Sequence, residues 1–88
     1  MTHRVAYTRT ARRVISEHLP LAVAAACLEF IATALAENPH RAGKSLRAPL
    51  EGLHSARRGE FRVIYRIDDE EVLVLVVTIQ HRRDVYRT

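Results

Sequence analysis

The chain has 88 residues, of which 48% are hydrophobic and 27% charged, so it has room for a single globular domain spanning residues 1–88. Its one cysteine, Cys27, excludes an internal disulfide framework and a cysteine-based zinc finger, and the absence of a long apolar run leads us to expect a soluble cytoplasmic protein with no membrane contact. Lys and Arg number 14 against 10 Asp and Glu, which gives a net charge of +4 and favours a polyanionic partner, above all nucleic acid.

The first half of the chain predicts a strand followed by two helices. Residues 4–8 read as a short strand, and Thr8 or Thr10 offers a side-chain oxygen to cap a helix that runs to about residue 18. A second helix is expected from residue 20 to about residue 37, because its apolar residues recur every three or four positions. The two segments form a helical hairpin, with Cys27 as a small hydrophobic residue in its core.

The second half predicts strands. Residues 40–52 carry no periodic pattern and read as a loop, after which strands are expected at 53–57, 61–67 and 72–79. Period-two alternation places Phe61 on one face of its strand and Arg62 on the other. The strand 72–79 is almost entirely aliphatic, which indicates a central strand covered on both faces, and residues 82–88 read as a short strand or extended end.

These elements define the expected fold class as α+β. The order is β-α-α-β-β-β, which corresponds to one curled, mostly antiparallel sheet with the helical hairpin packed on one face.

Several kinds of chemistry are not supported by the sequence. It holds no glycine-rich phosphate loop and no serine nucleophile motif. The five histidines are scattered without the spacing of metal ligands, so we expect no metal site and no cofactor. The acidic residues at 68–71 are consecutive and therefore diverge, as is typical of a solvated turn rather than a catalytic carboxylate pair.

A basic set remains in the second half of the chain. In an antiparallel sheet, the residues after position 79 lie near the start of the strand 61–67, so Arg62 and Arg82 can meet on one face beside Tyr86. Cations with an aromatic residue among them suit a phosphodiester and a stacked base. The alternative is a solvated arginine face that makes ion pairs with nearby carboxylates such as Glu60 and Asp84.

Long stretches of the chain resemble the RelE branch of the RelE/ParE superfamily of bacterial toxin–antitoxin systems. The resemblance rests on the opening YTRTARRVISEHLP, the loop NPHRAGK, the string GKSLRAPLEGLHSARRGEFRVIYRIDD and the ending HRRDVYR, which occur in the family's order. It implies a ribosome-dependent endoribonuclease that cleaves mRNA in the ribosomal A site by attack of a ribose 2′-oxygen on the adjacent phosphate.

The resemblance also implies roles for three residues. Arg62 corresponds to a strand arginine that stabilises the transition state, and Arg82 to a later arginine that stabilises it or donates a proton. Tyr86 corresponds to a tyrosine that stacks on a base of the RNA and also acts as the general base, which takes the proton from the 2′-hydroxyl. Paired lysines that the family carries before the glycine turn are missing here. His54, Arg57 or Arg58 is expected to replace them, and His54 is an alternative to Tyr86 as the general base. The RNA-binding candidates are Lys44, His54, Arg57, Arg58 and His81.

The partners implied by the resemblance are the ribosome with its mRNA and a cognate RelB-like antitoxin in a heteromeric complex. We expect acidic and apolar residues of the antitoxin to cover the helical hairpin and part of the basic face. Two other functions remain open: a ParE-like inhibitor of DNA gyrase, which needs no catalytic residues, and a non-catalytic ribosome- or RNA-binding regulatory module. The set Arg62, Arg82 and Tyr86 favours the ribonuclease.

Overall fold

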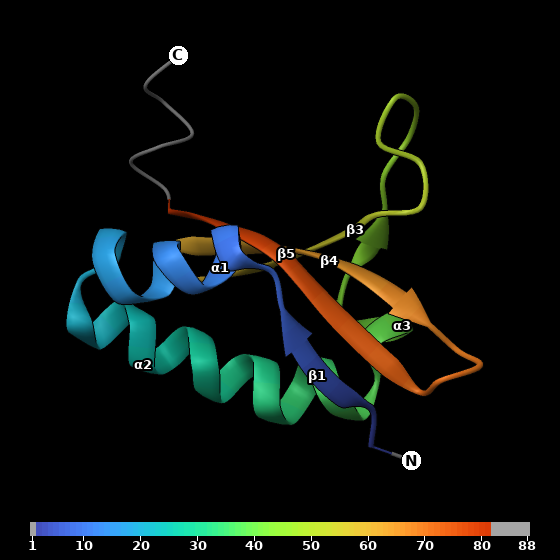
Figure 1. Ribbon diagram of the computed structural model, residues 1–88, viewed down its shortest axis with the longest axis horizontal. Helices are drawn as coiled ribbons and strands as arrows, with labels where there is room; N and C mark the ends of the chain where they lie inside the picture. The colour runs from blue at the N-terminus through green and yellow to red at the C-terminus, as the bar shows by residue number, and fades with distance from the viewer. Residues whose placement is uncertain (1, 82–88) are drawn as a thin grey trace.

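One five-stranded sheet organises the chain, seen in a computed structural model that describes residues 2–81 (Figure 1). Its strands are β1 (Arg4–Tyr7), β2 (Lys44–Ser45), β3 (His54–Arg58), β4 (Phe61–Asp68) and β5 (Leu73–His81). Their spatial order is β1-β5-β4-β3-β2, with β1 parallel to β5 and every other neighbouring pair antiparallel. The α+β class, the predicted order of elements and the mostly antiparallel sheet are confirmed.

A helical hairpin follows β1 and packs on one face of the sheet. Its first arm is α1 (Arg9–Arg13), which continues into the π-helical turn η1 (Val14–His18), and its second arm is α2 (Leu21–Phe30), which continues into η2 (Ile31–Leu35). Buried residues of both arms, among them Ala11 and Cys27, share one core with Val63, Tyr65 and Val76 of the sheet. We call the covered side the helix-side face and the other side the open face.

Thr8 fixes the junction between β1 and α1. Its side-chain oxygen accepts a hydrogen bond from the backbone N–H of Ala11 (3.1 Å), which settles the choice between Thr8 and Thr10 in favour of Thr8 as the helix cap. The same hydroxyl donates to the carbonyl of Val77 in β5. One side chain therefore joins the start of the helical hairpin to the middle of the sheet.

A β-bulge in β5 sets which of its residues face the core. Ile64 pairs with Thr78 and Tyr65 with Val76, so Val77 is the extra residue. The buried positions accordingly shift along the strand and are Val74, Val76, Ile79 and His81. The strand lies between β1 and β4, as expected for a central strand, but its open-face residues Leu73 and Leu75 are only half-buried, so the prediction of cover on both faces is wrong. The helices lie on one side alone.

The segment predicted as a loop over residues 40–52 contains two short elements. The helix α3 (Pro39–Ala42) begins at Asn38, whose side chain accepts a hydrogen bond from the N–H of Arg41 (3.3 Å), and β2 adds an edge strand beside β3. No helix within the described residues is long and apolar enough to cross a membrane.

Candidate nucleic-acid interface

Two arginines face each other across neighbouring strands on the open face. The regular pairing of β3 with β4 places Arg57 directly opposite Arg62, and the pairing of β4 with β5 places Gln80 on the other side of Arg62. Neither arginine makes an ion pair with a carboxylate among residues 2–81. Opposed like charges repel, and planar guanidinium groups bind phosphate oxygens well, so the pair suits an external anion such as a phosphodiester.

Further cations surround this pair on the open face. The next row across the sheet consists of Lys44, Ser55, Ile64 and Thr78, and in β4 Arg66 lies opposite Leu75 of β5. Basic side chains thus flank an apolar centre formed by Ile64 and Leu75. Ile64 is itself buried, so the half-buried Leu75 is the apolar side chain of this centre that an RNA base could contact, while the cations suit the phosphate backbone.

Lys44 owes its place in this row to a tight contact between β2 and the sheet. The hydroxyl of Tyr65 donates to the carbonyl of Pro39 (2.6 Å), which fastens α3 to β4. A Cβ atom at Gly43 would lie 2.5 Å from the carbonyl oxygen of Ser55 and 2.6 Å from the Tyr65 hydroxyl, so only glycine permits this approach. The strand that carries Lys44 follows directly.

His54 and Arg58 point to the opposite side of the sheet. Their partners in β4 are Tyr65 and Phe61, both buried against the helices. The His54 ring stacks on Tyr65 with centroids 5.5 Å apart, and burial, followed by the nearby His40, lowers its pKa. The guanidinium of Arg58 lies 5.4 Å from the centre of the Phe30 ring. These two candidates are therefore not brought together with Arg57 and Arg62.

The last candidate among the described residues is His81, at the end of β5. His81 pairs with Phe61 and is buried, which places it on the helix-side face. This pairing, with that of Gln80 and Arg62, confirms that residues 80 and 81 lie beside the start of β4. Arg82 and Tyr86 lie outside the described residues.

Sequence reasoning did not identify the contact between His40 and Asp69. The His40 Nε2 lies 2.9 and 3.0 Å from the two carboxylate oxygens of Asp69, and His3 lies 3.8 Å from the same carboxylate. The hydrogen bond from His40 holds the pKa of Asp69 below its usual value. The partners are 29 residues apart in the chain, so no local pattern signals the pair. No cluster of three or more potential metal ligands that could hold an ion occurs within residues 2–81.

The sequence of this chain matches a known protein family. Residues 5–86 match the family model described as the ParE toxin of the type II toxin–antitoxin system parDE. The chain belongs to this toxin family.

Two relatives place this family member in the RelE branch. It is 52% identical to Toxin RelE of Mycobacterium tuberculosis over 85 residues, which cover 97% of the chain and 87% of that protein. It is 46% identical to Toxin RelG of the same organism over 87 residues, which cover 99% of each protein. The resemblance to RelE toxins is thus confirmed.

Solved structures agree with this assignment. The toxin–antitoxin complex RelBE2 of Mycobacterium tuberculosis contains a chain that matches with a TM-score of 0.90 and 44% identity, over 96% of this chain and 95% of that one. The isolated RelE toxin of E. coli matches with a TM-score of 0.73 and 18% identity, over 90% of this chain and 83% of that one, which shows a shared fold.

Proposed function

We propose that this chain is the toxin of a RelBE-type module and inhibits translation by cleaving mRNA in the ribosomal A site. The observation that carries the proposal is the pair Arg57 and Arg62, which face each other on the open face without a carboxylate partner among the described residues. Its relatives at 46% and 52% identity are named as RelG and RelE toxins.

The proposed reaction is an intramolecular transesterification, which leaves a 2′,3′-cyclic phosphate on one RNA fragment and a 5′-hydroxyl on the other. The 2′-oxygen loses its proton and attacks the phosphorus, and the bond to the 5′-oxygen breaks as that oxygen gains a proton. Negative charge grows on the phosphate oxygens in the transition state, where Arg62 and Arg57 supply fixed positive charge. Lys44 lies one row away and would contact a neighbouring phosphate.

We assign both proton transfers to residues that follow β5 in the sequence. We assign the base to Tyr86, which must have its pKa of about 10 lowered by nearby cations, and the proton donor to Arg82. His54 receives no such role, because it stacks on Tyr65 on the other face of the sheet.

The same proposal includes a protein partner and a cellular location. A RelB-like antitoxin holds the toxin in a heteromeric complex, as supported by the match to the RelBE2 complex at 44% identity. Because the substrate is translated mRNA, the proposed location is the cytoplasm.

The test is primer extension on a defined mRNA translated in a purified system. Wild-type chain should cut at A-site codons only when ribosomes are present. The Arg62→Ala variant should cut at least 100-fold more slowly, since loss of one transition-state donor costs about 10² to 10³ in rate. Arg9→Ala, which removes an exposed arginine at the start of α1, should cut at the wild-type rate. Intact mRNA beside active translation would reject the proposal.

Inhibition of DNA gyrase is the second candidate, because the matching family model is described for ParE. A gyrase inhibitor has no need of an unneutralised arginine pair on the sheet. A chain that leaves mRNA intact and blocks supercoiling by purified gyrase would establish this second function. Translation arrest with intact mRNA would instead indicate a ribosome-binding module without chemistry.

A further inference from the structure

Strand β5 contributes no charged side chain to the open face. Its residues on that face include Leu73, Leu75, Thr78 and Gln80, which lie on either side of the bulge. The cations beside them belong to the neighbouring strands, with Arg62 and Arg66 on β4 and Arg57 on β3. The open face is therefore divided into a cationic part on β3 and β4 and an uncharged part on β5.

Gln80 lies in the same row as the arginine pair. It is the partner of Arg62, and Arg62 is the partner of Arg57, so the three residues follow one another across three strands. Neighbouring strands are about 4.8 Å apart, which puts the backbone of Gln80 about 5 Å from that of Arg62 and about 10 Å from that of Arg57. A phosphate held by the two arginines would leave the base of its nucleotide within reach of Gln80.

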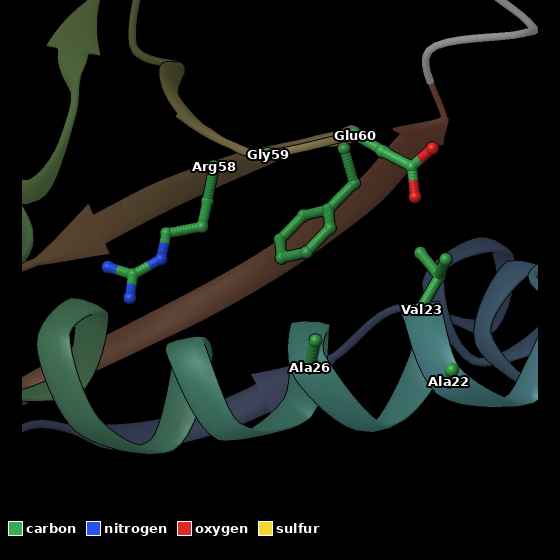
Figure 2. Close-up of a pocket in the computed structure, with 7 residues that line it drawn as sticks. Ala22, Val23, Ala26, Arg58, Gly59 and Glu60 are labelled. Carbon is green, nitrogen blue, oxygen red and sulfur yellow. The ribbon is translucent and has the colours of Figure 1, made fainter.

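The residues next to Gln80 and Arg57 in the chain turn to the other side of the sheet. His81 is buried on the helix-side face, and Figure 2 shows the side chain of Arg58 extending from the end of β3 toward α2. Gln80 is exposed and makes no side-chain hydrogen bond with any of residues 2–81. Its amide is therefore available to a molecule that binds on the open face.

A glutamine amide is suited to the edge of a base. It presents hydrogen-bond donors and an acceptor in one plane, and it can bond N6 and N7 of adenine at the same time. Adenine repeats the pattern of donor beside acceptor at N6 and N1, so it offers such an amide two edges. Both edges are open in single-stranded RNA, which proteins read by hydrogen bonds to unpaired bases. An arginine in place of Gln80 would instead bind the phosphate of any nucleotide.

We propose that Gln80 is a specificity-determining residue, which reads the edge of an adenine next to the phosphate held by Arg57 and Arg62. This inference rests on the proposed function, since it concerns the RNA bound at the same site. The cationic strands β3 and β4 bind the backbone of the RNA, and β5 selects the base. The hydroxyl of Thr78, one row away on the same strand, adds a second uncharged polar group for the base.

The test compares the affinity of the chain for two uncleavable strands by fluorescence anisotropy. Both strands are 2′-deoxy-substituted, and one contains only adenine and the other only cytosine, so the same base is offered in every binding register. Wild-type chain should bind the adenine strand at least about fivefold more tightly, which is the lower end of what a bidentate base contact provides. Equal affinity of wild-type chain for the two strands would overturn the proposal.

Variants at position 80 assign the preference to the amide. Gln80→Ala should reduce the affinity ratio to below twofold, mainly by weakening the binding of the adenine strand. Gln80→Met keeps the length of the side chain without its hydrogen bonds, should give the same result, and replaces Gln80→Ala if thermal unfolding shows that variant to be unfolded. Thr33→Val changes an exposed polar residue on η2 and should keep the wild-type ratio. Equal weakening of both strands by the Gln80 variants would mean a backbone contact and would overturn the proposal.

Cut sites in translated mRNA separate this proposal from the proposed function. Wild-type chain should cut most often beside adenine, and Gln80→Ala should lose that preference. A chain that cuts mRNA without regard to the base would overturn the role of Gln80 and leave the ribonuclease assignment standing. A chain that leaves mRNA intact but selects the adenine strand through Gln80 would have the opposite meaning: the ribonuclease assignment fails and the reading of the base stands.

Discussion

Arg57 and Arg62 occupy positions that are unfavourable for stability alone. Residues directly opposite on neighbouring strands have Cβ atoms about 5 Å apart, and like charges there destabilise the sheet. A Thr or Val at either position would serve the sheet better. Placing two cations there, beside the uncharged Gln80, departs from what folding favours, and such departures are expected at functional sites.

A second single residue, His54, predicts how the free energy of unfolding depends on pH. Its pKa is lowered in the folded chain, first by burial and then by the charge of His40, whereas an unfolded histidine has a pKa of about 6.5. Below that pH the unfolded chain therefore binds a proton more readily than the folded one. The free energy of unfolding should be highest above pH 6.5 and fall as the solution is acidified.

Urea unfolding between pH 5 and pH 8 measures this effect. The variant His54→Phe keeps a ring to stack on Tyr65 but cannot titrate, so its stability should vary less with pH than that of wild type. His18→Gln removes an exposed histidine and should leave the wild-type pH dependence in place. An unchanged slope in His54→Phe would contradict the assignment.

At the scale of elements, the junction of β1 and α1 depends on one hydroxyl. Thr8 caps α1 and also bonds the carbonyl of the bulge residue Val77. Loss of a helix cap costs about 1 kcal/mol, and loss of a second hydrogen bond costs about 1 kcal/mol more. Thr8→Ala should therefore lower the free energy of unfolding by about 2 kcal/mol.

Thr10→Ala is the matched control for this prediction. Thr10 lies within α1, is exposed and accepts no capping hydrogen bond, so its replacement should change stability by less than about 0.5 kcal/mol. Urea unfolding of the two variants at one pH gives the comparison. Equal losses would show that the cap does not lie at Thr8.

The elements that the sequence predicted are those whose own residues carry the signal. The hairpin arms show apolar residues at helical spacing, and β4 shows alternation that places Arg62 opposite the core face. The elements α3 and β2 were read as loop because they depend on distant contacts. Tyr65 holds α3 from 26 residues away, and β2 exists only by pairing with β3.

The candidate site was also predictable only where a strand's own residues carry the signal. Alternation within β4 separated Arg62 from Phe61, but the face taken by each residue of β3 depends on its register with β4. That register puts Arg57 on the open face and leaves His54 and Arg58 on the helix-side face. In β5 the bulge at Val77 changes the alternation, and the sequence holds no glycine or proline there to mark it.

For the whole molecule, the net charge of +4 matters less than its distribution. Lys44, Arg57, Arg62 and Arg66 belong to the open face, while Asp69, the carboxylate bound by His40, lies in the turn after β4. Cations on one face attract a polyanion to that face, and the attraction weakens as salt competes for the phosphates. RNA binding by this chain should therefore depend strongly on ionic strength.

The slope of RNA affinity against salt concentration, on logarithmic axes, gives the number of phosphate contacts that the chain makes. For a single strand, each phosphate neutralised contributes about 0.7 to the steepness of log K against log salt concentration. Arg57→Gln and Arg62→Gln should each make the slope shallower by about 0.7, because each removes one contact. Arg9→Gln lowers the net charge equally on α1 and should leave the slope unchanged. Fluorescence anisotropy with an uncleavable 2′-deoxy-substituted strand between 50 and 300 mM KCl measures it. Equal shifts in all three variants would mean that binding follows net charge rather than the open face.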